Sequence, residues 1–181
     1  SDGTVLAYVG NNYQPERKEY ESYVDMIRAK RSPGSTFKPL LYANMLTDGF
    51  ILPQTLIQDV PTTIGGYSPM NFDLGYDGAI PADKALSRSL NIPAVKMLQQ
   101  YKYERFYDKL KKLKFKTLEK PADHYGLSLI LGGSEVTMWD LSSVYLGLAR
   151  TLNHFNSYQG KYNINDYQLP TYIHNKAQPK A

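Results

Sequence analysis

The stretch Arg31–Pro39, Arg-Ser-Pro-Gly-Ser-Thr-Phe-Lys-Pro, decides how this chain can fold and what it can do. Its Ser-Pro-Gly portion is typical of a loop. From Ser35 onward, apolar residues recur at helical spacing as far as Gly49, which predicts a helix starting at Ser35. The proline that follows Lys38 falls in the first turn, where a missing N–H costs little. The stretch therefore predicts a serine at a helix start and a lysine one turn later.

A serine and a lysine at this spacing can act together as a nucleophile and its base. Residues three apart on a helix are neighbours on one face, so the Lys38 amine can reach the Ser35 hydroxyl. A serine needs a base to remove its proton, and a lysine can serve if burial lowers its pKa. The free N–H groups of the helix start favour negative charge developing beside Ser35. Alone, Ser-x-x-Lys arises often by chance, and a capping serine followed by a surface lysine explains it equally well.

A second motif, Ser89-Leu90-Asn91, lies on a short link between two predicted helices. A serine and an asparagine separated by one residue can direct both side chains into one cleft. The Ser89 hydroxyl could relay a proton to an amine, and the Asn91 amide could hold a substrate peptide bond. Alone, this motif is an ordinary helix cap.

Together and in this order, the two motifs resemble those of the serine acyl-transfer enzymes that bind penicillin. Arg31–Leu40 resembles the nucleophile segment of bifunctional, class A penicillin-binding proteins. Asp59–Thr62 and Gly65–Asp73 resemble the loop between the motifs, and Ala122–Thr137 resembles the 1C-type members in particular. The resemblance extends from about Thr4 to Leu152, so it is far more specific than either motif alone.

The resemblance implies a D,D-transpeptidase that cross-links peptidoglycan stem peptides and is trapped by β-lactam antibiotics. Ser35 would be the nucleophile, Lys38 its general base, Ser89 a proton relay and Asn91 the substrate-positioning amide. The Ser35 N–H would supply one oxyanion donor. No cofactor is expected. The family works at the periplasmic face of the bacterial inner membrane, so the parent protein would be membrane-anchored through a segment outside this chain.

The chain also departs from the family pattern, so we expect a partial transpeptidase domain. It contains no Lys-Thr-Gly and no Lys-x-Gly, the element that lines the cleft in the family. The family's glycosyltransferase domain is also absent. We expect residues 1–153 to be the family-like region and 154–181 to be a polar loop or tail. We also expect the fragment to cross-link and acylate poorly, because losing one oxyanion donor alone costs about two to three orders of magnitude in rate.

The expected fold class is mainly α, the helical part of an α+β parent fold of the transpeptidase and serine β-lactamase type. Ile51–Ala79 has no clear periodicity and is expected to be a long functional loop. One strand is expected at Thr4–Gly10, and its exposed edge could pair between chains, giving self-association. Helices beyond the one at Ser35 are expected at Pro81–Ser87, Pro93–Tyr101, Glu104–Leu113 and Thr137–Leu152, the last starting with a capping box.

Composition excludes several classes of function. The 181 residues suffice for one domain, and they contain no cysteine, so disulfides and thiolate metal sites are excluded. His124, His154 and His174 lack metal-ligand spacing, so no metal is expected. The net charge is +4, and much of the basic excess lies in the lysines between 109 and 116 and in Arg28, Lys30 and Arg31. These fit a solvated helix face, and no nucleic-acid-binding signature accompanies them.

Two rival functions remain open from the sequence. A serine β-lactamase or a β-lactam sensor domain shares both motifs and differs in whether it turns the β-lactam over. A non-catalytic interaction module would use Ser35 and Lys38 only as helix-start residues. In that case Ser35→Ala would leave penicillin binding by the intact parent unchanged.

Overall fold

The computed structural model describes residues 3–171, which form two compact units. The central unit comprises residues 32–112 and 118–135, and the terminal unit comprises the described residues of 1–31, 113–117 and 136–181. The strands are β1 (Leu56–Asp59) and β2 (Gly78–Pro81). The helices are α1 (Lys38–Thr47), α2 (Ala82–Ser87), α3 (Asn91–Tyr101), α4 (Tyr103–Lys112), α5 (Ala122–Tyr125) and α6 (Met138–Ser157), with 3₁₀ helices at Lys18–Tyr20, Gly34–Phe37, Gly126–Leu131 and Ile164–Tyr167.

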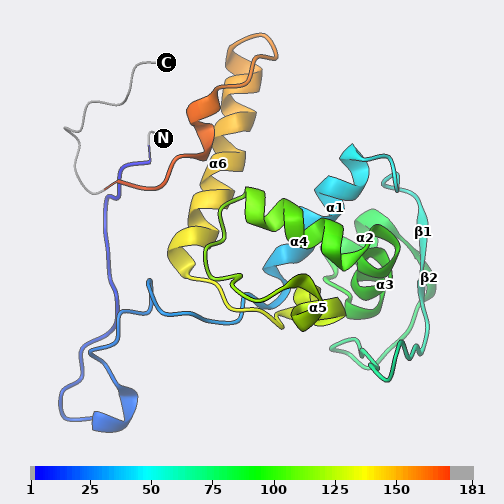
Figure 1. Ribbon diagram of the computed structural model, residues 1–181, viewed down its shortest axis with the longest axis horizontal. Helices are drawn as coiled ribbons and strands as arrows, with labels where there is room; N and C mark the ends of the chain where they lie inside the picture. Colours follow the sequence, from blue (N-terminus) through cyan, green and yellow to red (C-terminus); the bar gives the residue numbers. More distant parts are fainter. Residues whose placement is uncertain (1–2, 172–181) are drawn as a thin grey trace. The chain divides into compact units, whose positions relative to one another are not determined.

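Helix α3 is the centre of the central unit. Most of its faces are buried, because apolar residues occupy nearly every position from Ile92 to Leu98. It contacts α1, α2, α4, β1 and the 3₁₀ helix Gly126–Leu131 (Figure 1). Helix α4 instead buries one apolar stripe, Phe106 and Leu110, and leaves a charged face in solvent. A mainly α chain is thus confirmed.

The two strands form a feature that sequence analysis missed inside the expected loop Ile51–Ala79. They pair antiparallel, with Ile57 opposite Ile80 and Asp59 opposite Gly78. The ladder lies along one side of the central unit, next to α3 (Figure 1). Along β1 the buried positions are Ile57 and Asp59. Because a carboxylate takes one of the two inward positions, the apolar alternation that signals a strand is missing.

The predicted strand at Thr4–Gly10 is wrong. Thr4 makes one isolated parallel bridge, to Thr171, and no strand continues beyond it within the described residues. Leu6 and Val9 are exposed to 94% and 75%, so neighbouring structure does not cover this apolar run. A strand needs partners for its backbone groups, and β-branched residues alone do not supply them. The self-association expected from this edge therefore loses its structural basis.

The terminal unit is built on α6, which extends past the predicted end at Leu152. The predicted start is confirmed, since Thr137 Oγ1 accepts a hydrogen bond of 3.0 Å from Asp140 N. The expected tail at 154–181 begins inside this helix, and its residues 172–181 lie outside the described part. The 3₁₀ helix Ile164–Tyr167 packs back on α6, with Asp166 only 1% exposed. Because residues 154–181 are mostly polar, their sequence does not predict this packing.

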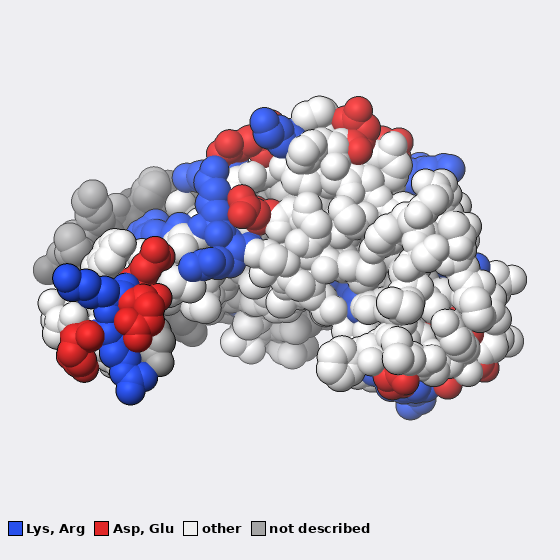
Figure 2. Space-filling model, turned by 90° about the horizontal axis from the view of Figure 1, so that it is seen from below, with Lys and Arg blue, Asp and Glu red and all other residues white. Residues whose placement is uncertain are grey.

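The lysine-rich run between residues 109 and 116 lies only partly on a helix, since Lys109, Lys111 and Lys112 belong to α4 and Lys114 and Lys116 follow its end. Lys109 forms an ion pair with Asp48, and Lys111 Nζ donates to Leu118 O at 3.0 Å. On the face shown in Figure 2, Lys and Arg side chains are interspersed with Asp and Glu side chains.

Replacing Tyr101 by Phe should destabilise the central unit by about 1.5 kcal/mol, because a charge-assisted hydrogen bond is lost. The Tyr101 ring is fully buried, and its hydroxyl donates to Asp48 Oδ2 at 2.6 Å. Burial and the adjacent Asp48 carboxylate raise the pKa of Tyr101, so the hydroxyl stays a donor. Urea denaturation of the 181-residue chain measures the loss. Tyr23→Phe, at a side chain 79% exposed, is the control and should change nothing measurable.

Candidate active site

Ser35 lies in the 3₁₀ helix Gly34–Phe37, which leads directly into α1. Gly34 has φ of +54°, a left-handed conformation that glycine adopts without strain, and this turn leads into Ser35, which is exposed. Phe37 is fully buried and anchors the segment. Since Ser35 is the second residue of its helix, helix geometry leaves its N–H without an intrahelical partner. The predicted helix start is confirmed, with a 3₁₀ first turn in place of an α-helical one.

Lys38 is the first residue of α1 and is only 2% exposed. Its Nζ lies 2.7 Å from Ser89 O, 3.2 Å from Ser89 Oγ and 2.7 Å from Asn91 Oδ1. Burial lowers the pKa of Lys38 from 10.5 to about 8. Below pH 8 this shift raises the fraction of neutral amine by roughly 300-fold, which is what a general base requires.

The contacts of Lys38 also determine where its lone pair is directed. A neutral amine has two N–H donors and one lone pair, whereas a backbone carbonyl and an amide oxygen can only accept. Ser89 O and Asn91 Oδ1 therefore use both N–H groups. The lone pair is left for a hydroxyl, and Ser89 Oγ is one such group within contact. This arrangement can pass a proton between a serine hydroxyl and the amine.

Ser89 and Asn91 are placed by an unusual link between α2 and α3. Ser89 has φ of +54°, which is rare for a residue other than glycine and turns its carbonyl and its hydroxyl toward Lys38. The Leu90 side chain is buried and anchors the link to the core. Asn91 is the first residue of α3, two residues earlier than predicted, and its Nδ2 donates to Met70 O at 2.9 Å.

The structure brings three of the four predicted residues into direct contact. Lys38 bonds to Ser89 and Asn91, which lie about 50 residues away in sequence. The expected contact between the Lys38 amine and the Ser35 hydroxyl is not among the hydrogen bonds of the described residues. Catalytic hydrogen bonds are often long in unliganded sites and shorten when substrate binds.

The support behind the Ser35 segment could not be seen in the sequence. Gly132 has φ of +97°, and a Cβ built on it would lie 2.4 Å from Ser32 Oγ and 2.9 Å from Gly34 Cα. Ser32 Oγ donates to Gly132 O at 2.8 Å. Gly132 is therefore in close contact with the turn that carries Ser35. The Gly-Gly pair was visible in the sequence, but its partner was not.

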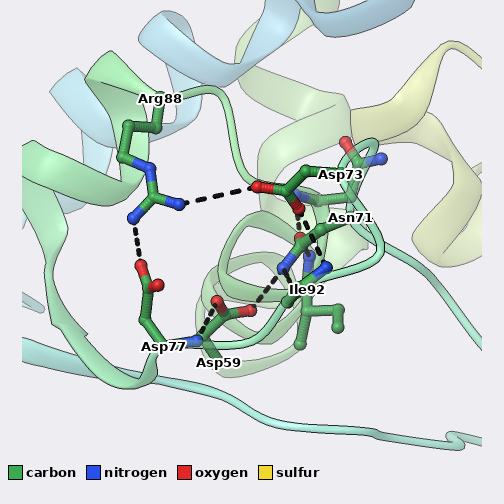
Figure 3. A network of polar contacts seen from close by, with 8 residues as sticks. Asp59, Asn71, Asp73, Asp77, Arg88 and Ile92 are labelled. Carbon is green, nitrogen blue, oxygen red and sulfur yellow. Dashed lines mark hydrogen bonds and ion pairs between the residues drawn. The ribbon is translucent and has the colours of Figure 1, made fainter.

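A buried polar pair, Asp59 and Asn71, contacts the start of α3 at Asn91 and was not predicted from the sequence. They are 1% and 2% exposed, and Asn71 Nδ2 donates to Asp59 Oδ1 at 2.8 Å (Figure 3). Asn71 Oδ1 accepts from the Asn91 backbone N–H at 2.9 Å. Both residues lie in segments noted only for their family resemblance, and no local signal marks them as buried.

Other kinds of site find little support in the described residues. Within 3–171 no group of three or more His, Asp or Glu side chains could hold a metal. His154 pairs with Asp166, and the His124 ring contacts Tyr125 edge to face, while His174 lies outside the described part. No helix in the same range is both long and apolar enough to cross a membrane.

Comparison with known proteins identifies the family. The profile described as "Penicillin binding protein transpeptidase domain" matches residues 1–149, most of the chain. This chain belongs to the penicillin-binding protein transpeptidase family. Among relatives of this family, penicillin-binding protein 1C of Escherichia coli is 43% identical over 150 residues, covering 83% of this chain and 19% of that protein. Penicillin-binding protein 1A of Pseudomonas aeruginosa is 30% identical over 174 residues, covering 93% of this chain and 19% of that protein.

Solved penicillin-binding structures share the fold. The D,D-transpeptidase domain of a peptidoglycan glycosyltransferase from Eggerthella lenta aligns with a TM-score of 0.63 at 16% identity, over 75% of this chain and 41% of that one. Penicillin-binding protein 1A from Haemophilus influenzae aligns with a TM-score of 0.57 at 24% identity, over 69% of this chain and 19% of that one. The penicillin-binding transpeptidase fold is thus confirmed. The chain spans about a fifth of the length of the curated relatives it matches.

Proposed function

We propose that this chain carries the nucleophile part of a peptidoglycan D,D-transpeptidase active site, and that β-lactam antibiotics acylate the same serine. The observation that supports this most directly is the buried Lys38 amine, held by Ser89 and Asn91 one turn after Ser35. A surface lysine that merely follows a capping serine would not be buried in contact with three oxygen atoms. Membership of the transpeptidase family supports the same conclusion.

The proposed reaction assigns a role to each of the four residues. Ser35 Oγ attacks the carbonyl carbon of the penultimate D-Ala, and its proton passes to neutral Lys38. The Ser35 N–H stabilises the oxyanion. The bond to the terminal D-Ala nitrogen then breaks, and that nitrogen leaves with a proton delivered through Ser89 Oγ. An amine of a neighbouring stem peptide next attacks the ester carbonyl and gives up a proton to neutral Lys38. The bond to Ser35 Oγ breaks as the cross-link forms, and Lys38 returns the proton to Ser35 Oγ. Asn91 holds the stem peptide. No step of this reaction requires a cofactor.

We place the reaction at the periplasmic face of the bacterial inner membrane, in a membrane-anchored parent protein, because that is where the family meets peptidoglycan. Residues 1–153 would be the family-like region, with the polar residues 154–181 following it. The 181 residues contain no Lys-Thr-Gly, and the family resemblance implies that such a strand completes the cleft. Activity should therefore be measured on the complete gene product that includes these residues.

The decisive experiment is to locate the covalent adduct. The complete gene product is incubated with a fluorescent penicillin, and peptide mass spectrometry identifies the acylated residue. We expect one stable adduct per molecule, on Ser35, and release of D-Ala from a pentapeptide substrate. Thr36→Ala is the matched control, because it removes the neighbouring hydroxyl, which donates to Pro33 O at 2.8 Å, and should label normally.

Two outcomes would favour a rival function. Rapid release of hydrolysed penicillin, with no product from stem peptides, would identify a β-lactamase. Absence of any adduct on the complete gene product would leave an interaction module and would contradict the proposal.

A further inference from the structure

We infer that Asn71 is a positioning residue of this active site. Asp59 holds the Asn71 amide, and Asn71 fixes the start of α3. It thereby fixes Ser89 and Asn91, the two residues that hydrogen-bond to Lys38. The inference rests on the proposed function, because it assigns Asn71 and Asp59 a part in acylation. Their effect on Ser35 is indirect and is transmitted through Asn91 (Figure 3).

Asn71 uses every hydrogen-bonding position of its amide. Its Nδ2 donates to Asp59 Oδ1 at 2.8 Å and to Gly75 O at 3.0 Å. Its Oδ1 accepts from Asn91 N at 2.9 Å and from Ile92 N at 3.2 Å. An amide offers two donors and two acceptor lone pairs, so none is left over. Asn71 is 2% exposed, although residues 72–79 beside it are all exposed. A side chain buried from such a loop has a specific structural task.

That task is to cap α3 from a distant part of the sequence. The residue before α3, Leu90, has no side chain able to accept a hydrogen bond, so the first N–H groups of the helix need another acceptor. Asn71 Oδ1 takes two of them, as an N-cap side chain would. The helix start that bears Asn91 is therefore fixed by a residue 20 positions away.

Asp59 determines which way the Asn71 amide points. A carboxylate can only accept, so it holds the NH₂ end of the amide toward itself and leaves the oxygen facing α3. The second carboxylate oxygen, Asp59 Oδ2, accepts from Asp77 N at 3.0 Å. Asp59 is 1% exposed and sits on β1, opposite Gly78 of β2, so the strand pair holds it rigidly. This explains why a carboxylate occupies an inward position of the strand.

The same short segment fixes the Asn91 side chain. Met70 O, adjacent to Asn71, accepts from Asn91 Nδ2 at 2.9 Å, which leaves Asn91 Oδ1 facing Lys38 Nζ at 2.7 Å. Two amides are thus oriented in series, the first by a carboxylate and the second by a carbonyl. Asp59 thus orients Asn71, Asn71 fixes Asn91, and Asn91 holds Lys38.

A charged pair on the outside of the loop contributes little by comparison. Arg88 forms ion pairs with Asp77 and, at 3.7 Å, with Asp73 (Figure 3). These side chains are between 35% and 55% exposed, and exposed ion pairs typically contribute under about 1 kcal/mol. The buried pair Asp59–Asn71, and not these exposed ion pairs, therefore positions the start of α3.

The test uses Asp59→Asn and Asn71→Asp in the complete gene product, measuring the rate constant for acylation by a fluorescent penicillin across pH. Each single change breaks the donor–acceptor match. In the first variant the new amide can present its NH₂ group to Asn71, and in the second the new carboxylate faces that of Asp59. We expect a loss of about 10- to 100-fold in each, since small misplacements near a reacting centre have effects of this size. Asp83→Asn, at a carboxylate on α2 that bonds to Gln54 away from the site residues, is the control and should acylate normally.

The pH profile separates positioning from a purely structural role. Loss of positioning in Asp59→Asn should expose the Lys38 amine and move the midpoint of the acylation profile upward from about 8. Removing a negative charge without movement would shift the midpoint the other way, because it disfavours the ammonium form. A fall in folded population alone would lower the amplitude and leave the midpoint unchanged. Either of these last two results would contradict the positioning role.

The exchanged pair, Asp59→Asn with Asn71→Asp, completes the test. In this double variant the amide at position 59 can donate to the carboxylate at position 71, and that carboxylate can still accept from the start of α3. We therefore expect recovery of at least tenfold over Asn71→Asp. Wild-type rates in both single variants, or an exchanged pair that folds without recovery, would overturn the inference and leave the proposed function standing. If Asp59→Asn does not fold, the inference is also overturned, because the pair is then needed for folding. No adduct on the wild-type protein would refute the proposed function itself.

Discussion

Lys38→Met is expected to slow acylation of Ser35 by about 1,000-fold, within the range that general base catalysis contributes. Methionine fills the buried space but has no lone pair that can take the serine proton. The wild-type rate should rise with pH and level off above about 8, because the lowered pKa makes the amine neutral there. The variant should lose this rise. Stopped-flow labelling of the complete gene product with a fluorescent penicillin, from about pH 6 to about pH 10, measures both effects.

Lys38→Arg distinguishes base catalysis from simple hydrogen bonding. A guanidinium can donate to Ser89 O and Asn91 Oδ1, but it stays protonated across this pH range and cannot act as a base. We therefore expect a loss as large as in Lys38→Met. Lys84→Met, at an exposed lysine of α2, is the matched control. A Lys38→Arg protein that acylates within about tenfold of wild type would contradict the role assigned to Lys38.

Gly132→Ala is expected to slow acylation by about 100-fold, because the added methyl group must displace the turn that carries Ser35. Its Cβ would meet Ser32 Oγ at 2.4 Å and the Gly34 backbone at 2.9 Å. A side-chain hydroxyl can rotate away, but a backbone contact at this distance requires the segment itself to move. The same labelling assay measures the effect, with thermal unfolding recorded in parallel.

Gly49→Ala is a closely matched control for this change. Gly49 has φ of +74°, and a Cβ there would meet nothing within 4 Å. It therefore imposes the same left-handed strain, about 1 kcal/mol, without a clash. We expect destabilisation in both variants and slow acylation only in Gly132→Ala. Equal acylation rates in the two proteins would show that Gly132 does not support the nucleophile.

The residues of the proposed site could be predicted from sequence because their motifs are local. Ser-x-x-Lys on a helix start brings two side chains to one face, and the Ser89–Asn91 pair identifies the link between two helices. Their meeting at Lys38 could not be derived from spacing, since about 50 residues separate them. Family resemblance supplied that connection, and the contacts of Lys38 agree with it.

The supporting residues were invisible for a physical reason. An asparagine among Gly and Pro residues is typical of a turn, so nothing in the sequence indicates that Asn71 is buried. The Asp59 carboxylate interrupts the apolar alternation that would have predicted strand β1. The β-branched run near Thr4 predicts a strand, but in the described part of the chain it makes only an isolated bridge, between Thr4 and Thr171. Local preference is a weak guide where distant contacts decide burial, and this affects the supporting residues of a site most.

The hydrogen bond between Asp59 and Asn71 also closes a loop, and this makes the segment between them tolerant of changes in length. Residues 61–68 are exposed or half-buried, and bonds such as that between Thr63 and Ser68 stay within the segment. Closure entropy grows only logarithmically, so doubling such a loop costs about 0.6 kcal/mol. Inserted sequence could therefore extend here without shifting Lys38. The chain thus offers a tethering point for a label or a fused domain directly beside a rigid site.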